Sequence, residues 1–186
     1  MSILLVPEKG PIEEGRDFRN AWLGAMAVWV AIGEKYLGGK YNPSTGVGFN
    51  MMNDSQRDAM WAMFGQSEAP LTWAERVALG TTFDRAMARW ENLPLLVKAF
   101  REVVKDAPDL VGSHCAGWAD YCEELLKGKP YHAVCWYHTS CGEDLWYAGS
   151  PDEEDDRRYD VSRDSGHWYL FDECPKGATV PGVGVG

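Results

Sequence analysis

The sequence predicts an α+β fold, with a helical N-terminal scaffold followed by a small antiparallel β-sheet of about three strands in the C-terminal part. Apolar residues recur at three- and four-residue steps up to about residue 127, which is typical of helices. Beyond that point, aromatic and β-branched residues gather in short runs, which is typical of strands. All five cysteines and all four histidines lie between His114 and Cys174, so the two parts also differ in chemistry.

The helical part begins after an extended start, with a helix expected from about Gly15 to Leu37. A short helix near Ser55 to Phe64 follows. Thr72 and Glu75 have the spacing of a capping box, which predicts the start of a third helix whose apolar stripe continues to Trp90. Pro94 suits the first turn of the next helix, which we expect to end near Asp106.

In the second part, Ser113 is the expected cap of a helix that runs to about Lys127. Three antiparallel strands are expected after it, at 131–139, 145–148 and 167–171. The predicted organisation is a helical subdomain (1–112), a helix-plus-sheet subdomain (113–175) and a flexible glycine-rich tail (176–186), with the subdomains forming one compact unit.

The charge distribution favours some partners over others. Of 186 residues, 45% are hydrophobic, so the chain can form a core, and the net charge is −10. Up to residue 113 there are 12 basic and 14 acidic residues, and after it 6 and 14, so most of the excess negative charge lies in the second part. Because an acidic chain is repelled by phosphates, we expect no direct nucleic-acid binding and a partner with a basic surface.

The N-terminal residues lack the basic and long apolar regions of a signal peptide, and the apolar run at 21–33 is shorter than the roughly 20 residues that cross a bilayer. The expectation is a cytoplasmic protein without a membrane partner, in the host cytoplasm if the chain is viral. In that compartment the five cysteines are expected to be reduced thiols.

Four residues, His132, Cys135, His138 and Cys141, follow one another at three-residue steps and are of the types that bind zinc. On a strand, however, side chains alternate between faces, so Cys135 would point away from His132 and His138. We therefore expect these cysteines and histidines to pack on a sheet and to bind no cofactor. A zinc-stabilised interaction module is the alternative.

Cys115 is the candidate nucleophile of a second alternative. It lies in the first turn of the predicted helix, where the helix dipole lowers the pKa of a thiol, and His132 or His167 is the candidate base. A nucleophile on a helix followed by a histidine on a strand is similar to the order of elements in papain-like cysteine hydrolases. That resemblance implies a cysteine hydrolase.

An acidic run, Asp152, Glu153, Glu154, Asp155 and Asp156, lies between two predicted strands. It is expected either to be a solvated excursion that protects a sheet edge or to dock on a basic protein surface, where carboxylates take the places of nucleic-acid phosphates. On the docking reading, four aromatic residues would share the surface: Trp136, Trp146, Tyr147 and Trp168.

Together these features favour a protein that acts by binding rather than as an enzyme. The acidic bias and the many Trp and Tyr residues resemble small acidic inhibitors encoded by bacterial viruses, including anti-restriction and anti-CRISPR proteins. The resemblance is one of general character and assigns no residue. It implies an anti-defence inhibitor that docks on the basic, nucleic-acid-binding surface of a protein complex.

Overall fold

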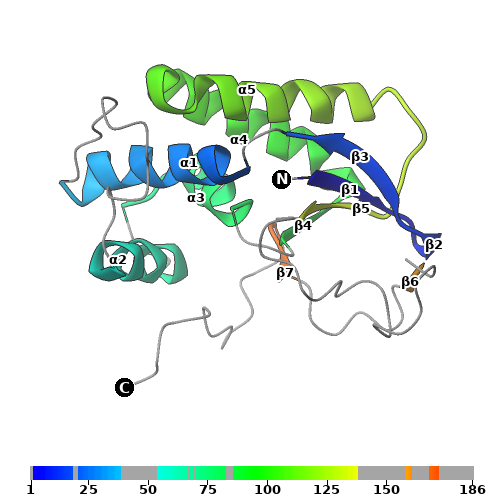
Figure 1. Cartoon of the computed structure of the whole chain (residues 1–186), viewed down its shortest axis with the longest axis horizontal. Coiled ribbons are helices and arrows are strands. Elements are labelled where there is room, and N and C mark those ends of the chain that lie inside the picture. Colours follow the sequence, from blue (N-terminus) through cyan, green and yellow to red (C-terminus); the bar gives the residue numbers. More distant parts are fainter. Residues whose placement is uncertain are drawn as a thin grey trace.

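In a computed structural model, the described residues are 2–18, 21–38, 54–66, 68, 70–82, 86–137, 158–160 and 168–171. They form an α+β fold of five α-helices and seven strands. Figure 1 shows the main sheet at one end of the molecule, α1, α2 and α3 grouped at the other end, and α5 running along the top over both. None of the described helices is both long and apolar enough to span a membrane.

The main sheet has the strand order β3-β1-β5-β4-β7. The neighbours β3, β1, β5 and β4 are antiparallel, and β7 pairs with β4 in parallel. The strands are β1 (Ser2–Val6), β3 (Glu13–Asp17), β4 (Ala86–Arg89), β5 (Ala133–Tyr137) and β7 (Trp168–Tyr169). A separate two-stranded sheet joins β2 (Lys9–Pro11) to β6 (Arg158–Asp160).

Strand β1 is apolar along its length because both faces of the sheet are covered around it. Ile3 and Leu5 belong to the main core cluster, together with Val134 of β5 and residues of the helices. Leu4 and Val6 belong to a second buried cluster. A strand buried on both faces has a continuous apolar run instead of an alternating pattern, which is how residues 3–6 read.

The helices build the rest of the core. Phe100 is central, because its ring lies 5.4 Å from that of Trp118 on α5 and 6.4 Å from that of Trp136 on β5. The helices are α1 (Ala21–Tyr36), α2 (Asp54–Gly65), α3 (Trp73–Gly80), α4 (Leu93–Asp106) and α5 (Pro108–Leu125), with one 3₁₀ turn at Trp90–Asn92.

The predicted order of a helical scaffold followed by a sheet is wrong. Strands β1 to β3 precede the helices, and β1 pairs with β5 across more than 100 residues of sequence. The sequence of β3 does not indicate a strand, because all five of its residues are exposed and none is a large apolar residue. A strand at the sheet edge needs no buried face of its own, so its sequence carried no alternation.

The helix predicted to continue to Trp90 is also wrong. Helix α3 ends at Gly80, and β4 occupies residues 86–89 with Ala86, Met87 and Ala88 all buried. Met87 and Ala88 face different clusters, which is the alternation of a strand. Their small or unbranched side chains have no marked strand preference, so the helical spacing of the apolar residues dominated the prediction.

Several local predictions are confirmed. The Thr72–Glu75 capping box is present at the start of α3, and Pro94 lies in the first turn of α4. The helix expected near 55–64 is α2. Helix α5, however, begins at Pro108 instead of Ser113, so the predicted subdomain boundary at residue 112 falls inside it. The predicted strand at 145–148 and the tail at 176–186 lie outside the described residues.

Candidate functional site

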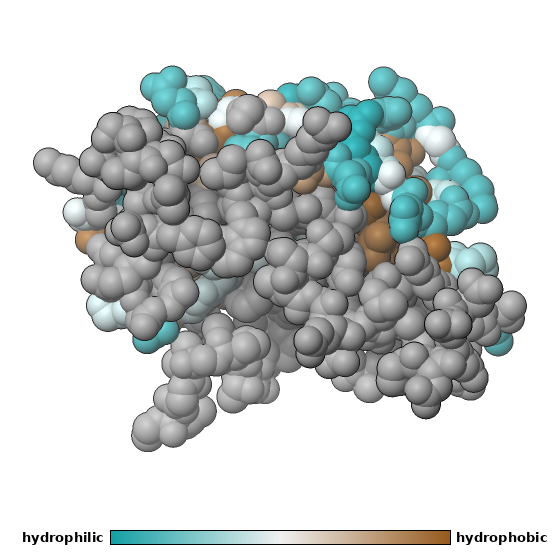
Figure 2. All heavy atoms as spheres, in the orientation of Figure 1, coloured by the Kyte–Doolittle hydropathy of each residue, from teal (hydrophilic) through white to brown (hydrophobic). Residues whose placement is uncertain are grey.

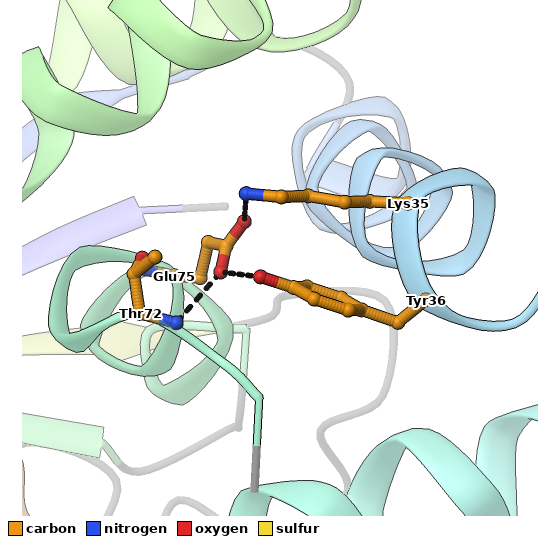
Figure 3. Close-up of polar contacts among 4 residues, drawn as sticks. All are labelled: Lys35, Tyr36, Thr72 and Glu75. Atoms are coloured by element: carbon orange, nitrogen blue, oxygen red, sulfur yellow. Dashed lines mark hydrogen bonds and ion pairs between the residues drawn. The ribbon is translucent and has the colours of Figure 1, made fainter.

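The most elaborate polar arrangement in the described part is centred on Glu75 of α3. One carboxylate oxygen, Oε1, accepts a hydrogen bond from Nζ of Lys35 at 2.7 Å. The other, Oε2, accepts from the Tyr36 hydroxyl at 2.7 Å and from the Thr72 backbone N–H at 2.8 Å. Figure 3 shows Lys35 and Tyr36 reaching from the end of α1 toward this carboxylate. The cluster therefore joins α1 to the start of α3.

The hydrogen bonds determine the charge state of this cluster. Only 6% of Glu75 is exposed, and burial by itself would raise the pKa of its carboxyl group. The hydrogen bonds from Lys35, Tyr36 and Thr72 outweigh burial and leave the pKa of Glu75 below its ordinary value. The bond to Glu75 raises the pKa of Lys35 in turn, so the two residues form an ion pair at neutral pH.

A small pocket lies beside this ion pair, with a volume of about 60 Å³. Its charged lining residues are Lys35, Glu75 and Asp106, and its remaining walls come from α1 and the end of α4. The apolar lining residues are Val28, Ala31, Ile32, Val103 and Ala107. The pocket is large enough for about two water molecules or the end of one side chain.

Cys115 is not placed for nucleophilic chemistry. Because α5 begins at Pro108, this residue lies two turns inside the helix and not in the first turn, so the helix N-terminus gives its thiol little help. Its side chain is fully buried, and burial raises the pKa of the Cys115 thiol to about 12. A thiol of this kind is protonated at neutral pH and is a poor nucleophile. The candidate base His132 is half-buried, and His167 lies outside the described residues.

Of the four candidate zinc ligands, only His132 and Cys135 lie among the described residues. Cys135 is fully buried in the second core cluster beside Met87 and Leu4. His132 precedes β5 by one residue and is only partly buried, and its backbone N–H donates to the Val6 carbonyl at 2.9 Å. In the described part of the chain, no three His, Cys, Asp or Glu residues are grouped as a metal site. His138 and Cys141 lie outside that part.

The acidic run, residues 152–156, lies outside the described residues, but the strand that follows it does not. Strand β6 begins at Arg158, two residues after Asp156, and pairs with β2. Two acidic residues that flank β2 in the sequence, Glu8 and Glu13, are exposed. Strand β6, the first described segment after the acidic run in the sequence, therefore lies beside β2.

The predicted aromatic contacts are only partly described. Trp136 is fully buried against Phe100, so its side chain is part of the core and not of a docking surface. Trp168 contributes its backbone to β7, beside β4. Trp146 and Tyr147 lie outside the described residues.

The visible surface of the described part is largely hydrophilic. Figure 2 shows polar residues along α5 and around the β2 end, with hydrophobic atoms only in small areas between them. The exposed acids in this region include Asp120, Glu123 and Glu124 of α5. Arg101 binds Asp120 at 2.5 Å and Glu123 at 3.1 Å, and Arg16 binds Glu124 at 3.1 Å. Much of the α5 charge is therefore neutralised within the molecule.

Sequence reasoning missed the pocket and the pairing of Glu75. The capping box identified Glu75 only as a residue at a helix start, and nothing in the sequence connected it to Lys35 or Tyr36, 39 to 40 residues earlier. Comparisons with protein-family models, with curated proteins and with solved structures gave no match.

Proposed function

We propose that the protein is an acidic protein-binding inhibitor of the anti-defence type, active in the host cytoplasm, which docks on a basic nucleic-acid-binding surface of its partner. The observation that carries the proposal is the attachment of the five-acid run to the β2–β6 strand pair on a molecule of net charge −10.

The charge itself supports the choice of partner. Carboxylates presented in a run can occupy the places of phosphates on a protein that binds DNA or RNA, and the long-range field of an acidic molecule speeds the encounter. The α5 acids are held by Arg16 and Arg101, whereas the run has five acids followed by two arginines. We therefore assign docking to the run, together with the exposed Glu8.

The test is a competition experiment. A fluorescent DNA duplex is bound to purified DNA-targeting CRISPR effector complexes and to restriction endonucleases, and the protein is titrated in at 0.15 M salt. Wild-type protein is expected to release the duplex from at least one of these complexes. A variant with residues 152–156 changed to the corresponding amides is expected to be at least about tenfold weaker, because five charged contacts are lost.

A matched variant controls for net charge. It neutralises five exposed acids elsewhere in the described part and should compete like the wild type; the five are Asp58, Glu68, Glu91, Glu102 and Asp109. Equal weakening of both variants would show that only total charge matters. Failure of the wild type to release DNA from any complex would contradict the proposed function.

A further inference from the structure

The pocket between α1, α3 and the end of α4 carries more negative than positive charge. Lys35 and Glu75 are bonded to each other at 2.7 Å and cancel. Asp106, the third charged lining residue, is exposed and has no hydrogen-bond or ion-pair partner among the described residues. One negative charge at the pocket is therefore uncompensated.

Two features determine which ligand would fit. Asp106 is the last residue of α4 and α5 begins at Pro108, so the opposite partial charges of the two helix ends meet here and the carboxylate of Asp106 itself supplies the negative charge. The pocket walls beside Asp106 are aliphatic, with Val28 and Ile32 on α1 and Val103 on α4. A ligand that fits has a compact positive end and an apolar stem.

We propose that this pocket binds the end of a lysine side chain from the partner. The ammonium group lies beside Asp106, and the last methylene groups contact Val28, Ala31 and Val103. At about 60 Å³ the pocket suits a compact ammonium better than the wide planar guanidinium of arginine. The identity of the partner as a basic protein rests on the proposed function. Figure 1 places α1 and α3 away from β2 and β6.

The test uses n-butylammonium chloride as the probe, with sodium chloride at matched ionic strength as the reference. Backbone amide signals of Val28, Ala31 and Val103 are expected to shift and to saturate in an NMR titration. The variant Asp106→Asn should weaken binding about two- to fivefold, the effect of one exposed charge. The control Asp109→Asn removes an exposed acid that does not line the pocket and should leave the affinity unchanged.

A second set of variants tests the proposal by filling the pocket with a larger side chain. Ala31→Leu should abolish the saturable shifts, and Ala107→Val is an independent filling variant if Ala31→Leu fails to fold. No saturable shift in the wild type, or equal effects of Asp106→Asn and Asp109→Asn, would overturn the pocket proposal.

This result is independent of the competition experiment. Butylammonium binding that is lost on filling supports the pocket even if no DNA is released, and in that case only the proposed function fails. Amide variants of residues 152–156 should bind butylammonium like the wild type, because the described lining residues come from α1, α3, α4 and Ala107.

Discussion

Glu75 combines two structural tasks in one side chain. Its carboxylate closes the capping box at Thr72 and also receives Lys35 and Tyr36 from α1. A buried carboxylate is tolerated only where hydrogen bonds replace its lost water, and here both oxygens are occupied. The orientation of α1 against α3 therefore depends on a charged group that sequence spacing identifies only as a cap.

Changing Glu75 to Gln should lower the free energy of unfolding by about 2 kcal/mol, because charge-assisted hydrogen bonds to Lys35 and Tyr36 are lost in a buried place. Urea denaturation measures the change. The control Glu102→Gln alters an exposed carboxylate that lies 3.8 Å from Lys98. It should lower the free energy of unfolding by less than about 0.5 kcal/mol. Similar losses in the two variants would contradict the structural role of Glu75.

His114 gives the protein a stability that depends on pH. Burial lowers the pKa of its imidazole below the ordinary value of 6.5. Between that lowered pKa and 6.5, the unfolded chain binds a proton that the folded chain does not. The free energy of unfolding should therefore fall as the pH is lowered through this window.

Urea denaturation at pH 7.5 and pH 5.5 tests this expectation. The loss of stability on acidification should be smaller in His114→Gln than in the wild type. Between pH 7.5 and 8.5, where the imidazole is neutral in both states, the difference between the two proteins should stay constant. An identical acid response in both would show that His114 makes no contribution.

At the scale of elements, β3 depends on a glycine. A Cβ atom at Gly15 would lie 2.5 Å from the backbone oxygen of Ile3 and 2.5 Å from the hydroxyl of Tyr121. The strand can therefore pack between β1 and α5 only without a side chain at this position. This contact fixes the edge strand against the helix that crosses it.

Replacing Gly15 by Ala should destabilise the protein by about 1–3 kcal/mol, because the backbone oxygen of Ile3 cannot move away without disturbing β1. Thermal unfolding would measure the effect. The control Gly112→Ala lies in α5 with open space around the added Cβ, and it should stabilise by about 0.5–1 kcal/mol. A neutral result for Gly15→Ala would indicate that β3 has freedom to shift.

The elements that sequence predicted well are those with local signals. The capping box at Thr72 and Glu75 and the proline at 94 act within one helical turn, so they could be read directly. Strands β3 and β4 have no such signal, since one is exposed throughout and the other has small side chains buried on both faces. Their place in the sheet depends on pairing with residues far along the chain.

For the candidate sites too, local geometry could be predicted from the sequence and long-range contacts could not. The structure buries Cys135 in the second core cluster, whereas His132 is only partly buried and lies just before β5. The position of Cys115 was predicted wrongly because α5 starts one and a half turns earlier than the expected cap at Ser113. The pocket at Glu75 brings together three helices, and no sequence spacing could have indicated it.

The whole molecule is held together by contacts across the predicted subdomain boundary. Strand β1 pairs with β5, α4 packs on α5 through Phe100 and Trp118, and β2 pairs with β6. Residues 1–112 expressed alone would lack β5, which is one of the two neighbours of β1, and most of α5, and residues 113–175 would lack the rest of the sheet.

Neither fragment is expected to show a cooperative thermal transition by circular dichroism, whereas the full chain should show one. Mixing the two fragments is the control, because restored cooperativity would show that each is intact. Cooperative unfolding of the 1–112 fragment by itself would contradict this prediction and would indicate that the subdomains fold independently.

The pairing of β1 with β5 also has a consequence for biosynthesis. Residues 2–6 are translated well before residues 133–137, and at about 5–20 residues per second the delay is roughly 6–25 seconds. During that time an apolar segment with strong strand propensity has left the ribosome without its neighbour on one side. We therefore expect the nascent chain to bind a chaperone that shields extended apolar segments, and slower translation between these two strands to increase aggregation.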